Sequence, residues 1–506
     1  MYEGMTPKEI EKEIEAALEM GDNSAYYPIG SQFLMDVQQS AVLYYIKNCH
    51  PEQKRLDGFS WDEIGMSQLF ALCYKARVRY CANNKSWYVY DGSAWVQDIA
   101  NLNITALGKE FVQLLDLYSN PFLTDEKYYA FKKQVAAFGK PRFRRDMLDD
   151  ARECLRISLN EFDRNPYLIN CKDGTYDLKT GHCRPASPED FITHKANCSV
   201  SLREITFPRW EQFIDEVTEG DKEKADYLQR ALGYSIFGTA REECMFILYG
   251  KSTRNGKSTL LDSINNLLGD YSTEAPVKLI CKGPVKKSAE DANPVLARLR
   301  GKRFVTMAES DQREKIDEAT LKQYTGGEEI TARALYQSPC TFLPQFTIWL
   351  SCNDLPSVED KSIFASNRIR IIEFNHHFTD QEQNKNLKEL FRTPEAAKAI
   401  MQWLITGYRK YCERGLQEPD TIKDVNKQFE KDCDIVLQFL SENYVPDATG
   451  SVVRKDVFNR FKMWCKSNDY SVMTSKKFGT EIQNCEGWHI KARKSGSWYY
   501  DGLKLV

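Results

Sequence analysis

The ten residues Gly250–Thr259, GKSTRNGKST, constrain this chain more than any other stretch of its sequence. They match G-x-x-x-x-G-K-[ST], the loop that binds the phosphates of nucleotides. In such a loop the glycines let backbone N–H groups point at the β-phosphate, Lys257 reaches the β- and γ-phosphates, and the Ser258 hydroxyl binds Mg²⁺. The whole loop is the predicted nucleotide-binding site: Gly250, Lys251, Ser252, Thr253, Arg254, Asn255, Gly256, Lys257, Ser258 and Thr259.

The residues on both sides of the loop agree with this interpretation. Met245–Tyr249 is apolar and predicts a buried strand that enters the loop. Apolar residues at helical spacing follow it: Leu260, Leu261, Ile264, Leu267 and Leu268. Phosphates would then lie at a helix N-terminus. A chance glycine turn before a surface helix is the alternative, but it leaves the register of strand, loop and helix unexplained. The sequence predicts a nucleoside triphosphatase with ATP and Mg²⁺ as cofactors.

Two further predicted strands each end at a polar side chain. Arg303–Ala308 leads to Glu309, and Phe346–Cys352 leads to Asn353. A carboxylate at such a strand end holds Mg²⁺ through water and polarises the attacking water, so Glu309 joins Ser258 as a predicted metal-site residue. A neutral amide binds the γ-phosphate or the attacking water without adding negative charge. Lys257, Glu309 and Asn353 are therefore candidate catalytic residues.

Two arginines, Arg368 and Arg370, stand just before and within a last predicted strand. Both are candidate catalytic residues, because either guanidinium can face a phosphate. In a ring of subunits, one of them would reach the γ-phosphate of the neighbouring subunit as an arginine finger. The alternative is that one of the pair makes a salt bridge at the edge of the sheet.

The charge of the chain is uneven. The net charge is −3, which gives no overall polycationic character, but residues 451–506 carry 11 Lys or Arg against 5 Asp or Glu. Their local charge of +6 leaves −9 on the remainder. A basic C-terminal region fits a nucleic-acid partner.

The cysteines and the hydropathy of the chain argue against a disulfide-stabilised protein and against a membrane-spanning one. The 15 cysteines include no C-x-x-C pair, which favours free thiols in a reducing cytosol. A loose group of thiols and imidazoles matches no standard zinc spacing: Cys171, His182, Cys183, His194 and Cys198. The longest uncharged run, Leu335–Asn353, is too polar to span a bilayer, and no targeting segment is visible. We expect no membrane partner.

In the N-terminal half, the spacing of apolar residues changes from the period of a helix to the two-residue period of a strand. Helices are predicted at Pro7–Met20, Gln32–Asn48 and Met66–Arg79, and then at Thr105–Leu117 and Lys127–Phe138. Between them, Trp87–Tyr90 and Trp95–Val96 read as a hairpin around Asp91-Gly92. Tyr167–Asn170 and Thr175–Leu178 read as short strands, and Trp210–Leu232 as two helices before the loop strand.

Several blocks of this sequence resemble a known family. "WYVYDGSAWVQD" and "NPYLINCKDGTYDLKTGHCRPASPEDFITHKANCSV" are similar to the segment before the motor in phage, plasmid and poxvirus primase-helicases. From the phosphate loop onward, Glu309, "LKQYTGGEEITARALY", "IWLSCNDLP" and "NRIRIIEF" follow in the order of superfamily 3 helicases. The resemblance covers roughly Tyr80 to the C-terminus. It implies an AAA+-like α/β motor with Glu309 as the second Walker acid and Asn353 as the polar sensor.

The resemblance also bears on the two arginines and on DNA contacts. It favours Arg368 as the finger, although the family often has two adjacent arginines where this chain has Asn367-Arg368, so the choice between Arg368 and Arg370 stays open. In the family, a hairpin before the sensor strand projects into the channel of the ring. Here two β-prone arms, Ile330–Ala332 and Cys340–Phe342, flank that position. Arg333 is then the candidate for phosphate contact and Tyr336 for base stacking.

The C-terminal region reads as helices followed by a basic β-hairpin. Helices are predicted at Gln383–Phe391, Glu395–Cys412, Asp432–Tyr444, Arg454–Ser467 and Ser475–Asn484, and strands at Trp488–Ala492 and Ser497–Leu503. The order suggests a winged-helix module, in which the family commonly ends. Five cations are its candidate DNA contacts: Lys476, Lys477, Lys491, Arg493 and Lys494. A solvated basic surface is the alternative.

The length of the chain allows about three or four domains, and the blocks above suggest a division into five parts. These are an N-terminal helical region (1–79), a helicase-associated α+β region (80–206), an AAA+ ATPase motor (207–378), a helical lid or connector (379–445) and a winged-helix-like domain (446–506).

The hypothesis is an ATP-dependent DNA helicase of phage or mobile-element replication, working as a homo-oligomeric ring, a hexamer, in the cytoplasm of a bacterial host. Its expected partners are single-stranded and forked DNA. One alternative is the helicase part of a primase-helicase. The region before Tyr80 is too short for a primase domain, so a primase or polymerase would be a separate chain. The other alternative is an ATP-switched origin-binding or loading protein that does not unwind DNA.

Overall fold

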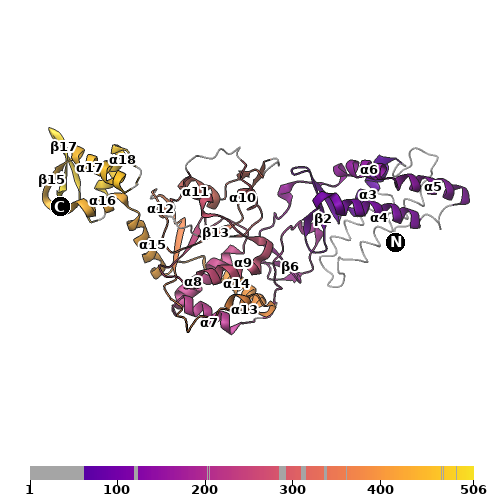
Figure 1. The fold of residues 1–506 in the computed structure, drawn as a ribbon, viewed down its shortest axis with the longest axis horizontal. Helices are drawn as coiled ribbons and strands as arrows, with labels where there is room; N and C mark the ends of the chain where they lie inside the picture. Colours follow the sequence, from indigo (N-terminus) through magenta and orange to yellow (C-terminus); the bar gives the residue numbers. More distant parts are fainter. Residues whose placement is uncertain are drawn as a thin grey trace.

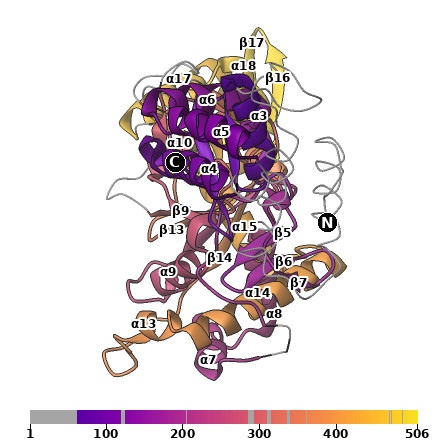
Figure 2. The same ribbon diagram turned by 90° about the vertical axis from the view of Figure 1, so that its right-hand side faces the viewer.

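The computed structural model describes residues 62–118, 124–201, 203, 205–283, 292–308, 315–334, 339–359, 362–468, 470, 472–485 and 487–506. The predicted helices Pro7–Met20 and Gln32–Asn48 lie outside these ranges, as do Glu309 and Tyr336. Three groups of elements follow one another along the long axis of the molecule (Figure 1). Seen along that axis, the two terminal groups lie on the same side, opposite helices α7 and α13 of the central group (Figure 2).

The N-terminal group packs four helices against a small sheet. The helices are α3 (Glu63–Tyr74), α4 (Leu102–Tyr118), α5 (Asp125–Phe138) and α6 (Pro141–Cys154). The strands are β1 (Val78–Cys81), β2 (Ser86–Tyr90), β3 (Trp95–Gln97) and β4 (Arg156–Ile157), in the order β3-β2-β1-β4. The predicted hairpin is confirmed as β2 and β3.

The helix predicted at Met66–Arg79 is wrong in its last turn. The helix ends at Tyr74, and Val78–Cys81 forms β1 instead. The reason is tertiary: β1 pairs with β2 on one side and β4 on the other, and both of its end residues are fully buried. Pairing and burial outweigh a local helical pattern that propensity alone would extend.

The segment that follows β4 connects the N-terminal group to the central one. Its strands β5 (Leu168–Cys171), β6 (Gly174–Asp177) and β7 (Cys183–Arg184) form an antiparallel sheet. Beside it, His194 lies 3.2 Å from Asp163 and stacks on Tyr271 of the central group. Burial raises the pKa of Asp163, but the charge of His194 and hydrogen bonds from His194 and Thr193 offset this and lower it to about 2. Asp163 therefore stays ionised beside His194, and the ring of His194 links this segment to the central group through Tyr271.

The centre of the molecule is a parallel sheet of five strands in the order β14-β8-β13-β10-β9. Its strands are β8 (Met245–Tyr249), β9 (Ser272–Glu274), β10 (Phe304–Ala308), β13 (Thr347–Cys352) and β14 (Ile369–Glu373). Both faces are buried, as a parallel sheet requires. On β8, Phe246 and Leu248 join one core and Met245 and Ile247 the other. The predicted strands are confirmed within one residue.

Helices cover both faces of this sheet. The first core contains side chains of α7 (Pro208–Val217), α8 (Lys222–Ser235), α9 (Lys257–Leu268), α13 (Leu387–Phe391) and α14 (Pro394–Arg414). The second contains side chains of α10 (Pro294–Ala297), α11 (Glu318–Thr325), α12 (Ser362–Ala365) and α15 (Asp420–Asp432). The helix predicted at Gln383–Phe391 begins only at Leu387, so the residues before it form a loop.

The C-terminal group has its own core. Its elements follow the order α16 (Ile435–Asn443), β15 (Tyr444–Val453), α17 (Arg454–Ser467), α18 (Ser475–Gln483), β16 (Lys491–Ser495) and β17 (Ser497–Leu505). The sheet order is β15-β17-β16. The strand predicted at Trp488–Ala492 is shifted: Trp488 and Ile490 are core residues ahead of β16. The sequence analysis missed β15, because its largely exposed side chains carry no apolar alternation.

Among the helices that the structure describes, none has both the length and the apolar character needed to cross a bilayer. The described cysteines are free thiols.

Glycines set the distance between α8 and α14. A Cβ atom on Gly407 would lie 2.1 Å from the carbonyl oxygen of Gln229, and one on Gly233 would lie 2.2 Å from the backbone nitrogen of Tyr408. The two helix backbones therefore touch, and any side chain at these positions would push the helices apart.

Gly407→Ala should lower the free energy of unfolding by about 2 kcal/mol or more because the helices must move apart. This loss should exceed the gain of about 1 kcal/mol that alanine gives over glycine inside a helix. Thermal or denaturant unfolding measures this. The matched control is Gly108→Ala in α4, where a Cβ would meet only the flexible Leu148 side chain at 3.3 Å. Equal stability of the two variants would contradict the close approach.

Candidate nucleotide-binding site

The loop after β8 has a backbone that only glycine accommodates at two positions. Gly256 has φ +86°, and a Cβ there would lie 2.6 Å from Val217. At Gly250 a Cβ would lie 2.4 Å from the carbonyl oxygen of Phe374. Helix α9 begins at Lys257, directly after this turn. The amides of the turn thus lie at a helix N-terminus, the arrangement that binds phosphate.

Asn255 holds the loop closed from within. Its side chain is buried, and its amide nitrogen donates to the carbonyl of Ser252 at 2.6 Å. A second, longer contact of 3.5 Å reaches the carbonyl of Gly250. These two contacts tie the two sides of the loop together from within. On its outside, the side chains of Lys251, Thr253 and Ser258 are exposed to solvent.

The structure brings two of the predicted catalytic residues together. Lys257 is only 4 % exposed, and its ammonium donates to the carbonyl of Gly250 at 3.1 Å and to Oδ1 of Asn353 at 3.0 Å. The contact follows from the topology, because β13 lies beside β8 with Cys352 opposite Tyr249. Asn353, the next residue, projects at the same carboxyl edge. Cation and amide thus converge where a γ-phosphate would lie.

Carboxylates also occur at this edge. Glu309 follows β10, a neighbour of β13, but lies outside the described residues. Burial raises the pKa of Tyr249, and the charges of Glu373 and Asp354 raise it further. These two acids end β14 and follow Asn353, and the sequence analysis did not single them out. They add negative charge where Mg²⁺ would bind.

Arg368 lies at the opposite end of the sheet from the phosphate loop of its own subunit. Its carbonyl accepts from the amide of Met245, the first residue of β8, so it is five residues, or roughly 17 Å, from Gly250 along the strand direction. Its guanidinium pairs with Glu243 at 2.7 Å and donates to Thr325 at 2.9 Å. Arg368 cannot contact a phosphate bound to its own loop.

Arg370 sits within the edge strand β14 and is held by two carboxylates. Its guanidinium lies 3.3 Å from Glu242 and 3.2 Å from Glu418. Burial lowers its pKa, but Cys244, Tyr227 and Glu418 raise it above the ordinary value. These ion pairs agree with the alternative in which this arginine makes a salt bridge at the edge of the sheet.

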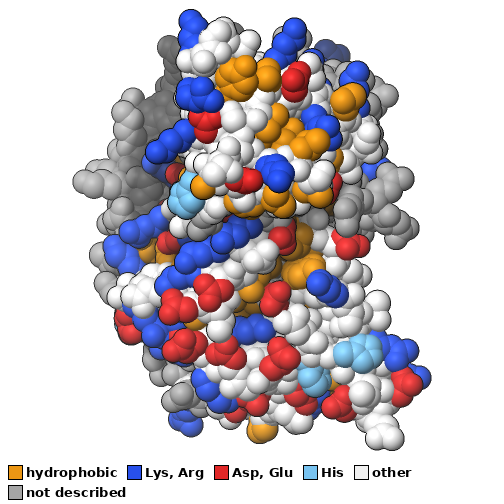
Figure 3. All heavy atoms as spheres, turned by 90° about the vertical axis from the view of Figure 1, so that its left-hand side faces the viewer, with side chains coloured by type: hydrophobic (Ala, Val, Ile, Leu, Met, Phe, Trp, Pro, Cys, Tyr) orange, Lys and Arg blue, Asp and Glu red, His pale blue; other side chains and the backbone are white. Residues whose placement is uncertain are grey.

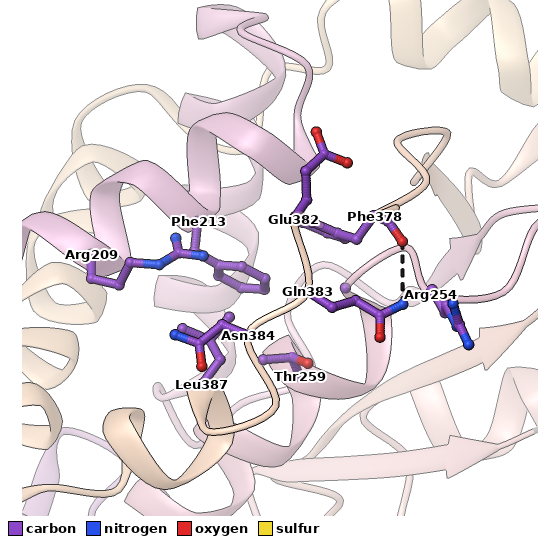
Figure 4. A pocket seen from close by; sticks show the side chains of 10 residues that line it. Arg209, Phe213, Arg254, Thr259, Phe378, Glu382, Gln383, Asn384 and Leu387 are labelled. Atoms are coloured by element: carbon purple, nitrogen blue, oxygen red, sulfur yellow. Dashed lines mark hydrogen bonds between the residues drawn. The ribbon is translucent and has the colours of Figure 1, made fainter. Parts of the chain in front are cut away.

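A cavity of about 180 Å³ opens beside the end of the loop. Its lining comes from α7, the loop and the segment before α13: Arg209, Phe213, Arg254, Gly256, Thr259, Phe378, Glu382, Gln383, Asn384 and Leu387. Figure 4 shows Phe213 and Phe378 on the two sides of this space, with Gln383 near Arg254. An apolar wall with a few polar groups is typical of a small-molecule site. The motif could not reveal it, because most of these residues lie outside it.

The predicted DNA-contact residues are dispersed over two hairpins and a helix. The predicted arms are confirmed as β11 (Ile330–Ala332) and β12 (Cys340–Phe342), which pair antiparallel, with half-buried Arg333 directly after β11. In the C-terminal group, Lys477 pairs with Glu481 at 3.6 Å and Arg493 with Asp501 at 2.7 Å. The remaining cations of that set have no carboxylate partner among the described residues: Lys476, Lys491 and Lys494.

The cysteines and histidines of the 171–198 segment do not form one cluster: His182 is exposed, and Cys183 is half-buried. Cys171 and Cys198 are buried, and His194 is engaged with Asp163. Across the described part of the chain, no three potential metal ligands of the His, Cys, Asp or Glu type gather in one place.

Three family models match this chain. They are "D5 N terminal like" over residues 67–219, "Family of unknown function (DUF5906)" over residues 248–370, and "Poxvirus D5 protein-like" over residues 431–504. Together the three stretches span more than half of the sequence. The second model covers the phosphate loop, Asn353 and both arginines.

The similar curated proteins come from viruses. A "Putative helicase" of Acanthamoeba polyphaga mimivirus is 28% identical over 342 residues, which are 63% of this chain and 35% of that protein. A "Putative helicase" of Sputnik virophage is 25% identical over 54% of this chain and 36% of that protein. A "Putative primase" of African swine fever virus is 20% identical over 88% of this chain and 46% of its own length. The chain therefore spans less than half of the relatives it matches.

Among solved structures, the apo structure of the NrS-1 C-terminal region aligns with a TM-score of 0.48 and 12% identity. The alignment covers 88% of this chain and 99% of that one.

Asn353→Ala should leave ATP binding within about threefold of wild type, since Lys257 keeps its contact with Gly250. Turnover should fall about a hundredfold, the size of effect that loss of one polar group facing a developing charge produces. A fluorescent nucleotide and a phosphate-release assay measure the two quantities. Asn375→Ala, which removes an exposed amide near the same edge, is the control. Normal turnover of Asn353→Ala would contradict the role of the amide.

Proposed function

Because this chain belongs to the primase-helicase family of superfamily 3, we propose that it is an ATP-driven DNA helicase of viral or mobile-element replication. The observation that carries the proposal is the Lys257 ammonium, held between Gly250 and Asn353 at the carboxyl edge of the parallel sheet. The names of the viral relatives, helicase and primase, support the same class of activity. The phage and bacterial-host expectations stay predictions that no relative tests.

The strand order supports an AAA+-like motor. The strand that enters the phosphate loop, β8, lies between β13, which delivers the sensor amide, and β14, which follows the candidate finger. The cavity beside Thr259 lies on the side of the loop where the sugar and base of a bound nucleotide would extend. Two aromatic rings, Phe213 and Phe378, suit a planar base there.

Each residue of the site has a distinct task in hydrolysis. Lys257 neutralises charge on the β- and γ-phosphates, and the loop amides bind the β-phosphate. The exposed Ser258 hydroxyl and Glu309 are the residues that would hold Mg²⁺, and the ion would supply positive charge to offset that of the phosphates. Glu309 polarises the attacking water, and Asn353 orients it without adding negative charge.

The position of Arg368 supports a ring. Since this side chain cannot reach its own phosphate loop, an arginine finger at this position must act on a neighbouring subunit. The adjacent surface, with exposed Glu243, would then lie at the subunit interface. We propose a homo-oligomer, a hexamer, in which every nucleotide site is completed by Arg368 of the next chain.

Two regions are proposed to contact single-stranded and forked DNA. Arg333 directly follows β11, and Tyr336 lies in the sequence between the two arms before the sensor strand. The C-terminal group has the element order of a winged-helix module. Its cations Lys476, Lys491 and Lys494 are available for phosphates. Priming would require a separate primase or polymerase chain, or a further part of a longer protein.

Lys257→Ala should abolish hydrolysis and weaken ATP binding, because the ammonium that offsets phosphate charge is lost. DNA-stimulated phosphate release measures it. Lys278→Ala, which removes an exposed lysine of the central group outside the phosphate loop, is the control and should keep most of the activity. Wild-type turnover in Lys257→Ala would show that the loop is not the catalytic site.

Arg368→Ala subunits should bind ATP yet lose about a thousandfold or more in turnover. Mixed with Lys257→Ala subunits, they should recover activity, since some interfaces then combine an intact loop with an intact finger. Arg370→Ala is the comparison: loss of a cation paired with Glu242 and Glu418 should lower the melting temperature. No recovery in the mixture, together with a monomeric mass in the presence of ATP and DNA, would contradict the ring.

A further inference from the structure

One aromatic side chain of the C-terminal group is not part of its core. Trp498, near the turn of the β16–β17 hairpin, is 47 % exposed, whereas Trp488 and Tyr500 are buried. Exposing an indole to water is unfavourable, so a large aromatic side chain at the surface of a lobe usually has a binding role. The surrounding residues indicate which partner it fits.

The register of the hairpin places Trp498 on the face of the sheet that packs against the helices. Residues opposite each other on paired strands point to the same side. Ala492 lies opposite Tyr500, and Lys494 lies opposite Trp498. Tyr500 is in the core, so Lys494 and Trp498 lie on the same face of the sheet, nearer the turn. There the helices no longer bury the face, since both side chains are exposed.

Arg454, the first residue of α17, fixes the indole next to α18. Its guanidinium lies 5.7 Å from the ring of Tyr500 and 6.0 Å from that of Trp498, both within cation–π range. A glycine of α18 makes room for it, because a Cβ on Gly479 would lie 2.4 Å from Nη2 of Arg454. Arg454 therefore links the exposed ring to buried Tyr500 and to α18.

Two cations adjoin Trp498: Arg454 at its ring and Lys494 opposite it on the sheet. Lys494 neighbours it on the sheet, and Lys476 projects from the exposed side of α18. Neither is paired with a carboxylate in the described part of the chain, whereas Arg493, on the other face, is paired with Asp501. Figure 3, which looks at this end of the molecule, shows Lys and Arg side chains together with hydrophobic and acidic ones. Cations next to an aromatic ring fit phosphates next to a base.

We infer that Trp498 stacks on the unpaired base at a junction between single-stranded and duplex DNA, with Arg454 and Lys494 facing the adjoining phosphates. The inference rests on the proposed function, which it extends to a particular DNA structure. Inside a continuous duplex both faces of each base are covered by neighbouring pairs. An indole fixed by the protein gains stacking only where a base face is free, as at a fork.

Trp498→Ala should weaken binding to a fluorescently labelled fork about tenfold, the effect of losing one aromatic–base stack. Affinity for a blunt duplex of the same length should change less than twofold. Trp498→Phe should restore most of the fork affinity, because it keeps an aromatic face. Fluorescence anisotropy at one fixed salt concentration measures all three.

The control is Met463→Ala, which removes a 65 % exposed apolar side chain from α17 of the same group and should bind the fork as wild type does. Wild-type fork affinity in Trp498→Ala would overturn the inference, and so would an equal loss on blunt duplex at an unchanged melting temperature. The rate of ATP hydrolysis without DNA distinguishes a failure of this inference from a failure of the proposed ATPase motor. Trp498→Ala should hydrolyse ATP at the wild-type rate, whereas a wild-type protein that binds forks through Trp498 but hydrolyses no ATP would contradict only the motor.

Discussion

The buried ammonium of Lys257 is the constraint on which the rest of this structure depends. A charge that is 4 % exposed must be matched by polar partners, and the chain supplies the carbonyl of Gly250 and the amide of Asn353. Those partners are close only because β8 and β13 are neighbours in a parallel sheet and end at the same edge. A phosphate entering this edge meets a cation that is already oriented, so little reorganisation is needed when it binds.

The two ends of the same sheet have different tasks. Lys257 and Asn353 lie at the carboxyl edge, while Arg368 lies at the amino edge, beside Met245. A single chain cannot bring these groups to one phosphate, because the length of a strand separates them. In the proposed ring, each interface would unite the two edges from different chains. Tight packing of α8 on α14 through Gly407 keeps the surrounding helices in fixed positions.

How far the sequence predicts the site depends on whether a residue belongs to a local pattern. The phosphate loop and the approach of Asn353 to Lys257 could be predicted, because parallel strands align their carboxyl ends. Phe213 and Phe378 could not, since they meet at the cavity only after α7 and the segment before α13 fold against the loop. The sequence also does not show the ion pairs of the two arginines, because Glu243 beside Arg368 and the carboxylates beside Arg370 come from other elements of the fold. The sequence around Val78 follows a helical pattern, but pairing within the sheet makes this segment a strand. That pairing is known only from the tertiary structure.

In the proposed function, nucleotide hydrolysis at this edge drives strand separation. The most direct measurement is displacement of one labelled strand from a forked duplex by the wild-type protein with ATP and Mg²⁺. We expect complete separation with ATP and none with a non-hydrolysable analogue. A protein that hydrolyses ATP on the same fork yet leaves the strands paired would contradict it, and would instead fit a loading protein that assembles on DNA without unwinding.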